Sequence, residues 1–142
     1  MDQDSILELL RTSHTIAVVG CSDKPDRDSY RVAAYLQQAG YRIIPINPHA
    51  AEILGECCYP DLSSVPAVAE IDIVDVFRRP EVVPEVVEQA LARGVRALWL
   101  QLGVSHAEAE RQAAEAGLQV VADRCIKVEH QARRDRLQGP KL

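Results

Sequence analysis

The sequence predicts an α/β fold in which a doubly wound parallel sheet of about five strands lies between two layers of helices. Two observations support this prediction. Short β-rich apolar runs alternate with helical segments along the chain, and 142 residues suit a single domain with little room for a second. Crossovers between parallel strands are right-handed, and the common doubly wound topology predicts the strand order 3-2-1-4-5.

The predicted strands are apolar runs bounded by glycine, proline or charged residues. They cover residues 15–20, 42–47, 71–77, 97–103 and 118–122. Pro45 interrupts the second strand, and it cannot donate a hydrogen bond to a neighbouring strand.

The predicted helices follow from apolar spacing and capping residues. They cover residues 6–10, 30–39, 80–93 and 105–116, with two shorter ones over 50–54 and 64–69. Ser5 is expected to cap the first helix, and Ser105 with Glu108 forms the capping-box pattern of the helix over 105–116. The core is expected to span about 14–130, and the charged residues 127–142 are expected to form a frayed helix or a disordered end.

Composition excludes several classes of protein. The formal net charge of −5 argues against a general binder of nucleic acid or of anionic membranes. No apolar run is long enough to cross a membrane, and the first residues lack the pattern of a signal peptide. The four cysteines form no CxxC pair, which favours a reduced cytoplasmic protein. No histidine pair has metal-ligand spacing, so no metal site is predicted, and no catalytic constellation is visible.

The fold class itself predicts a ligand site. In an open α/β sheet, ligands bind beyond the carboxyl ends of the strands, where the strand order reverses. The residues that follow the first four strands are Gly20, Cys21, Ser22, Asn47, Pro48, Phe77, Arg78, Gln101, Leu102 and Gly103. A glycine at the first turn allows close backbone approach, and the helix after it presents free N–H groups to an anion.

The charged loop after the first strand adds candidates whose roles stay open. Lys24 and Arg27 alternate with aspartates, so a solvated loop is the alternative to a ligand contact, and Arg31 follows at the helix start. Ser29 is either the helix N-cap or a ligand contact. Arg78 is the best single cation for a ligand, and the alternative is a contact with Asp75 or with a neighbouring helix end.

Two nucleotide-binding motifs are absent. The dinucleotide fingerprint needs GxGxxG after the first strand and an acid near the end of the second, but the chain has GCSDKP and Asn47 there. A nicotinamide dinucleotide is therefore disfavoured. The GxxxxGK[ST] loop of nucleotide hydrolases is missing as well.

Several segments together resemble a known family. They are residues 16–22 (IAVVGCS), 40–48 (GYRIIPINP), 53–56 (ILGE), 74–78 (VDVFR), 98–103 (LWLQLG) and 123–127 (DRCIK). This set is similar to the small stand-alone coenzyme A (CoA)-binding proteins, which resemble the N-terminal domain of the succinyl-CoA synthetase α subunit. The resemblance covers residues 15–130 and implies a single Rossmann-like domain that holds CoA across the carboxyl edge of its sheet.

The resemblance also implies roles for the site residues. The loop at Gly20, Cys21 and Ser22 would approach the phosphates, and Asn47 with Pro48 would line the nucleotide. The residues bordering the adenosine or the pantetheine would be Phe77, Arg78, Leu100, Gln101 and Leu102. Cys21 stands where a small residue such as alanine is expected. It is either an inert small hydrophobe or a thiol that reacts with oxidised CoA.

The expected function is the binding of CoA or an acyl-CoA by a module without chemistry of its own. The synthetase needs a following domain with a phosphorylated histidine and a nucleotide-grasp partner, whereas this chain stops at Leu142. A CoA-dependent enzyme and an NAD(P)-binding redox sensor are the alternatives. The expected partner is a small molecule, with no nucleic acid and no membrane. Cys125 is expected to be a small buried residue and Trp99 to pack in the sheet.

Overall fold

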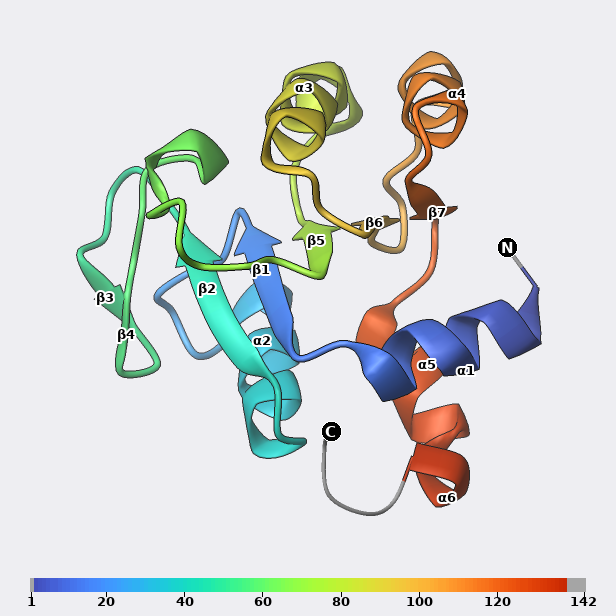
Figure 1. Cartoon of the computed structure of the whole chain (residues 1–142). Coiled ribbons are helices and arrows are strands. Elements are labelled where there is room, and N and C mark those ends of the chain that lie inside the picture. The colour runs from blue at the N-terminus through green and yellow to red at the C-terminus, as the bar shows by residue number, and fades with distance from the viewer. Residues whose placement is uncertain (1, 138–142) are drawn as a thin grey trace.

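The computed structural model describes residues 2–137 and contains a five-stranded parallel sheet between two layers of helices (Figure 1). The strands of this sheet are β1 (Thr15–Val19), β2 (Arg42–Ile46), β5 (Ile73–Val76), β6 (Ala97–Leu100) and β7 (Gln119–Val121). The helices are α1 (Gln3–Thr12), α2 (Asp28–Gln38), α3 (Val83–Arg93), α4 (Ala107–Glu115), α5 (Ile126–Ala132) and α6 (Arg134–Leu137). The predicted fold class is confirmed.

The strand order differs from the prediction. It is β2-β1-β5-β6-β7, so the third strand of the sheet pairs with the first and not with the second. The predicted order would place β2 inside the sheet, where Pro45 would leave a neighbouring strand without a hydrogen-bond donor. At the edge, β2 has to pair only with β1 within this sheet. The order reverses between β1 and β5, which moves the expected ligand site to the ends of these two strands.

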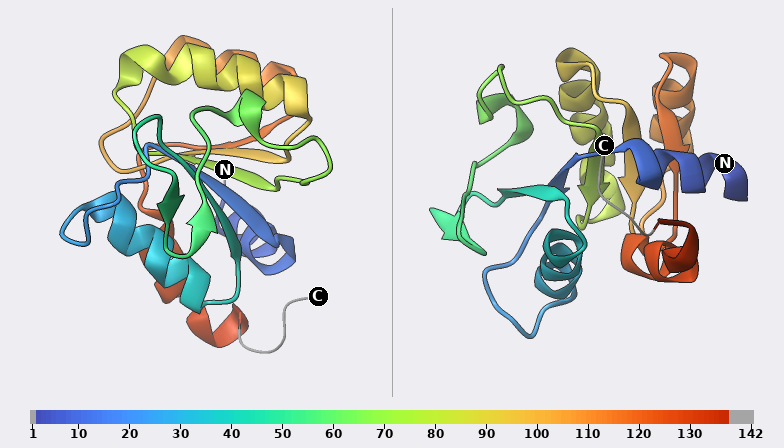
Figure 2. Two further views of the ribbon diagram at one scale, coloured as in Figure 1. Left: turned by 90° about the vertical axis from the view of Figure 1, so that its left-hand side faces the viewer. Right: turned by 60° about the horizontal axis from the view of Figure 1, so that its bottom comes forward.

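The two faces of the sheet are covered by different helices. Helices α3 and α4 lie on one face, and α1, α2, α5 and α6 lie on the other (Figures 1 and 2). Alternate residues of β1 point to opposite faces, as the period of a strand requires. Ile16 and Val18 pack in the cluster under α1 and α2, whereas Ala17 and Val19 pack in the cluster under α3 and α4.

The connection between β2 and β5 contains a hairpin where a short helix was predicted over residues 50–54. Its strands are β3 (Glu52–Ile53) and β4 (Glu56–Cys57), and they lie beyond the β2 edge in Figure 1. Leu54 and Gly55 both have positive φ, 55° and 78°, as a two-residue hairpin turn requires. The second predicted helix, over 64–69, is replaced by a single 3-10 turn, η1 (Leu62–Ser64).

Two helices begin with caps other than the predicted ones. The Asp2 carboxylate accepts the Ser5 N–H at 2.8 Å, so Ser5 lies inside α1 and does not cap it. At α4 the cap is His106 in place of Ser105. Its ring nitrogen accepts a first-turn N–H, and the Glu110 carboxylate accepts the His106 N–H at 2.8 Å. This arrangement is a reciprocal cap like the predicted box, but its carboxylate lies four residues after the cap and not three.

Residues 126–137 form two packed helices, contrary to the prediction of a frayed or disordered end over 127–142. Helices α5 and α6 contact α1, and α5 also contacts α2. Ile126, His130 and Arg133 are buried, and the Tyr35 hydroxyl lies 2.7 Å from Nδ1 of His130. The last predicted residues, 138–142, lie outside the described part of the chain. Among the described residues, no helix has both the length and the hydropathy that crossing a membrane requires.

Candidate functional site

Two adjoining cavities open at the carboxyl edge of the sheet. The turn cavity, of about 320 Å³, is lined by Gly20, Ser22, Arg27, Asp28, Ser29 and Phe77. The main cavity, of about 680 Å³, is lined by Asp28, Arg31, Val32, Phe77, Arg78, Arg79, Pro80, Gln101, Leu102, Gly103, Val104, Cys125, Lys127 and Val128. Because both linings include Asp28 and Phe77, one elongated ligand can occupy both cavities.

The turn after β1 is held against the ends of both neighbouring strands. The N–H groups of Gly20 and Cys21 donate to the Ile46 carbonyl at the end of β2, at 3.0 and 3.2 Å. Gly20 has a φ of +85°, and a β-carbon there would lie 2.5 Å from the Phe77 carbonyl oxygen. Glycine is therefore required for the turn to approach β5, whereas the sequence suggested that it makes room for a ligand.

The start of α2 presents backbone donors to the turn cavity. Ser29 is not the N-cap, because it lies within the helix and its Oγ accepts the Ser22 N–H at 2.9 Å. The N-cap position is Arg27, which makes no side-chain capping bond. The N–H groups of the first turn thus have no capping side chain, as suits an anion-binding helix end. Asp28 in this turn pairs with Arg31 at 2.6 Å, which offsets its charge.

Two predicted site residues, Cys21 and Leu100, are fully buried and offer no surface to a ligand. Leu100 points into the core under α3 and α4 because alternate residues of β6 face opposite sides of the sheet. Burial, together with the neighbouring Cys58 and Asp75, raises the pKa of the Cys21 thiol to about 12. The structure therefore favours the inert role for Cys21 over a reaction with oxidised CoA.

Asn47 supports the turn from the end of β2. Its side-chain NH₂ donates to the Cys21 carbonyl at 2.9 Å, and its side-chain oxygen accepts the His49 N–H at 2.7 Å. The exposed Pro48 and Lys24 lie outside the linings of both cavities. In this conformation these three predicted residues border the two cavities without lining them.

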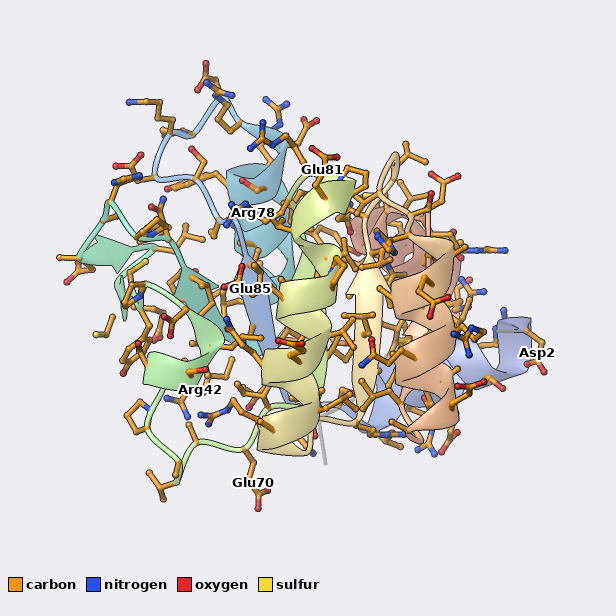
Figure 3. The ribbon with its side chains drawn as sticks, turned by 90° about the horizontal axis from the view of Figure 1, so that it is seen from above. Asp2, Arg42, Glu70, Arg78, Glu81 and Glu85 are labelled. Carbon is orange, nitrogen blue, oxygen red and sulfur yellow. The ribbon has the colours of Figure 1, made fainter. Side chains whose placement is uncertain are left out.

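Arg78 is exposed and has no ion pair with Asp75, so the predicted Asp75 alternative is wrong. Both Asp75 carboxylate oxygens lack a hydrogen-bond partner among the described residues, and burial raises the pKa of this carboxyl well above its usual value. Figure 3 shows Arg78 at the end of the sheet where the β1–α2 turn projects, with Arg42 and Glu70 at the opposite end. The Arg78 guanidinium is thus available to a ligand.

The end of β6 supplies the floor and one wall of the main cavity. Gln101 is only 5% exposed, and its Oε1 accepts the Ile126 N–H at 3.0 Å. Leu102 is 71% exposed, and Val128 on α5 is 54% exposed. Large apolar side chains at the surface of a cavity indicate that its ligand has an apolar part.

The sequence prediction missed the α5 side of the main cavity. Cys125, Lys127 and Val128 line it, although only the residues after the first four strands were considered. The signal was present in the sequence, because these residues follow the fifth strand and so lie at the same edge of the sheet.

Positive charge is concentrated at this edge, although the chain as a whole has a net charge of −5. The charged residues that line the two cavities are Arg27, Arg31, Arg78, Arg79 and Lys127, opposed by Asp28.

The chemistry of this edge is that of a binding site for a phosphorylated ligand. Arginine, lysine and free backbone N–H groups are the groups that bind phosphates. Among the described residues, no cluster of histidine, cysteine, aspartate and glutamate is suited to hold a metal ion.

Comparison with known proteins agrees with this chemistry. Residues 14–131 match the CoA binding domain family. The chain is 45% identical over 125 residues to the uncharacterized protein YneT of Bacillus subtilis, covering 88% of this chain and 91% of that protein. It also superposes on a hypothetical protein from Pyrococcus horikoshii with a TM-score of 0.88 and 40% identity, covering 98% and 94% of the two chains.

A much longer relative is an enzyme. The ADP-forming acetate–CoA ligase II of Archaeoglobus fulgidus is 30% identical over 84 residues, which are 58% of this chain and only 12% of the ligase. The similarity thus concerns one small part of that enzyme. The match over residues 14–131 spans both cavities and the whole sheet, and on this ground the chain belongs to the CoA binding domain family.

Proposed function

We propose that this protein binds CoA or an acyl-CoA across the two adjoining cavities. The observation that carries the proposal is the division of the site into two parts. Uncapped N–H groups, Ser22, Ser29 and Arg27 surround the turn cavity, whereas the main cavity adds the exposed apolar side chains of Leu102 and Val128. Its cations are Arg31, Arg78, Arg79 and Lys127. CoA is divided in the same way, with its phosphates near one end and an uncharged pantetheine arm at the other.

In this arrangement the diphosphate lies at the start of α2, and the arm extends over the ends of β5 and β6. Arg78 stands between the two parts and neutralises phosphate charge. Phe77, which lines both cavities, packs against the ligand where it passes from one to the other. Gln101 and Leu102 contact the arm.

We further propose that the protein acts as a binding or regulatory module without a reaction of its own. The titratable groups that line the two cavities are arginines, Lys127, Asp28 and Cys125. Asp28 pairs with Arg31, so among the described residues that line the two cavities there is no free carboxylate or histidine to act as a general base for Cys125.

Calorimetry and thermal unfolding with CoA, acetyl-CoA, NAD and NADPH test the ligand class. Binding to the folded state alone stabilises it by about 2.7 kcal/mol when the free ligand is at about a hundred times its Kd. We expect this response from CoA or acetyl-CoA and none from the dinucleotides. A response to NAD or NADPH without one to CoA would instead support a redox sensor.

The same incubations test the absence of chemistry. We expect acetyl-CoA to be recovered intact after incubation with the protein, with or without ADP and phosphate. Release of free CoA at a rate proportional to the protein concentration would support a CoA-dependent enzyme.

A further inference from the structure

Cys125 is the cysteine that lines the main cavity. It is half-buried, directly precedes α5, and its thiol has no hydrogen-bond partner among the described residues. The other three cysteines differ in their surroundings. Cys21 and Cys58 are buried, and Cys57 is exposed on β4, outside the linings of both cavities. Position therefore distinguishes Cys125 from every other thiol of the chain.

A second group beside Cys125 also points to a ligand. Gln101 is only 5% exposed, and it lines the same cavity. Its Oε1 accepts the N–H of Ile126, the residue after Cys125, which leaves the NH₂ group without a partner among the described residues. The buried unpartnered side-chain atoms of the described residues belong to Ser13, Asp75 and Arg133, so the NH₂ group of Gln101 is open to the cavity and can donate to a ligand there. The pantetheine arm carries two amide carbonyls that are suited to do so.

The direction of the bound ligand follows from the two cavities. With the phosphates at the start of α2, the proposed arrangement puts the arm in the main cavity, whose lining includes Leu102, Cys125 and Val128. The thiol is at the far end of the arm from the phosphates. In this arrangement the sulfur of bound CoA lies in the cavity that Cys125 lines.

We propose that Cys125 exchanges with CoA disulfide and becomes the site of a mixed disulfide between the protein and CoA. The Cys125 thiolate attacks one sulfur of CoA disulfide, the bond between the two CoA sulfurs breaks, and a Cys125–CoA disulfide forms. The second CoA leaves as a thiolate and takes up the proton that Cys125 lost. No other oxidant is needed, because the disulfide consumed supplies the oxidising equivalent. The inference rests on the proposed function.

The experiment compares wild type, Cys125→Ser and Cys57→Ser by intact mass after incubation with CoA disulfide or oxidised glutathione. Glutathione disulfide offers the same reactive bond without the nucleotide that the site binds. We expect wild type and Cys57→Ser to gain one CoA, and Cys125→Ser to gain none. Because binding raises the local concentration of the disulfide, the CoA adduct should form about tenfold or more faster than the glutathione adduct. Dithiothreitol should remove it.

Gln101→Glu tests the role of the neighbouring amide. Glutamate keeps an oxygen for the Ile126 N–H and removes the free NH₂ donor. We expect this variant to form the CoA adduct more slowly than wild type, and the glutathione adduct at the wild-type rate. Equal slowing with both disulfides would show only that the thiol has been disturbed.

The outcomes separate this inference from the proposed function. Calorimetry with reduced CoA under reducing conditions should give the same affinity for wild type and Cys57→Ser, because Cys57 lies outside the linings of both cavities. If CoA binds but the adduct forms on Cys57, or forms equally fast with glutathione, the inference is wrong and the proposed function stands. If wild type binds no reduced CoA, the proposed function itself fails.

Discussion

Gly20 and Phe77 approach so closely that a β-carbon on Gly20 would lie 2.5 Å from the Phe77 carbonyl oxygen and 2.9 Å from Cδ of Arg78. This contact joins the turn after β1 to the end of β5, the two strands between which the order of the sheet reverses. The placement of the Arg78 side chain thus depends on the absence of a side chain at position 20.

Gly20→Ala should therefore destabilise the fold more than a glycine substitution that only strains the backbone. Gly94 is the matched control, because its φ is +70° and a β-carbon there would meet nothing within 4 Å. We expect Gly20→Ala to cost about 1–3 kcal/mol more than Gly94→Ala, the usual cost of overpacking. Urea unfolding of the two variants measures the difference, and equal costs would contradict the tight contact.

Arg78→Ala should weaken CoA binding by about 1–3 kcal/mol, the contribution of hydrogen bonds to a charged group. The effect should shrink as salt is added, because Arg78 is exposed. Arg42→Ala is the control, since Arg42 lies at the opposite end of the sheet in Figure 3. Calorimetry at two salt concentrations checks the prediction. Similar losses in both variants would place the ligand elsewhere.

Asp75 should make stability depend on pH. In the folded protein burial raises the pKa of this carboxyl, whereas in the unfolded chain it keeps the ordinary value near 3.8. As pH rises above about 4, the unfolded chain therefore loses the Asp75 proton first, and the free energy of unfolding falls by up to about 1.4 kcal/mol per pH unit until the folded pKa is reached. Asp75→Val removes this decline.

Unfolding of wild type and Asp75→Val between pH 4 and pH 8 tests the sign. The variant should gain stability relative to wild type as pH rises, since an unpartnered buried carboxylate is replaced by an apolar side chain. A stability difference that stays constant over this range would mean that the carboxyl titrates alike in both states.

Arg93 on α3 fixes the backbone of the segment between η1 and β5 through hydrogen bonds. Its guanidinium donates to the carbonyls of Val65, Pro66 and Ala69 at 2.7 to 3.0 Å. Arg93→Met should cost roughly 2 kcal/mol or more and increase hydrogen exchange in residues 65–69, because several charge-assisted bonds are lost together. Arg96→Met, which removes a neighbouring arginine without such bonds, should leave exchange in that segment unchanged.

Local pattern in the sequence was enough to predict the elements of the main sheet. The apolar runs of β1, β5 and β6 are short, β-rich and bounded by polar or glycine residues, so they were located correctly. Trp99 packs in the sheet as predicted, fully buried, with its ring N–H donating to the Arg124 carbonyl at 2.8 Å. The strand order was missed because it depends on long-range pairing, although Pro45 in β2 already indicated an edge strand.

The candidate site was predicted only in part, because local pattern shows where a strand ends but not which way each side chain points. Residues that follow a parallel strand lie at the carboxyl edge of the sheet, and on this basis Phe77, Arg78 and Gln101 were correctly expected at the edge where the main cavity opens. The face to which each residue points depends on the alternation along the strand and on the helices above it. This is why Leu100, next to Gln101, lies in the core.

The bond from the Ile126 N–H to Gln101 has a consequence for shortened forms of the protein. A fragment ending after β7 would contain the residues of all five strands of the main sheet. It would nevertheless lack one wall of the ligand chamber, and the Gln101 side chain would lose its anchor. Trimming the C-terminal helices for crystallisation or fusion would therefore open this cavity and uncover the side chains that α5 and α6 bury against α1 and α2.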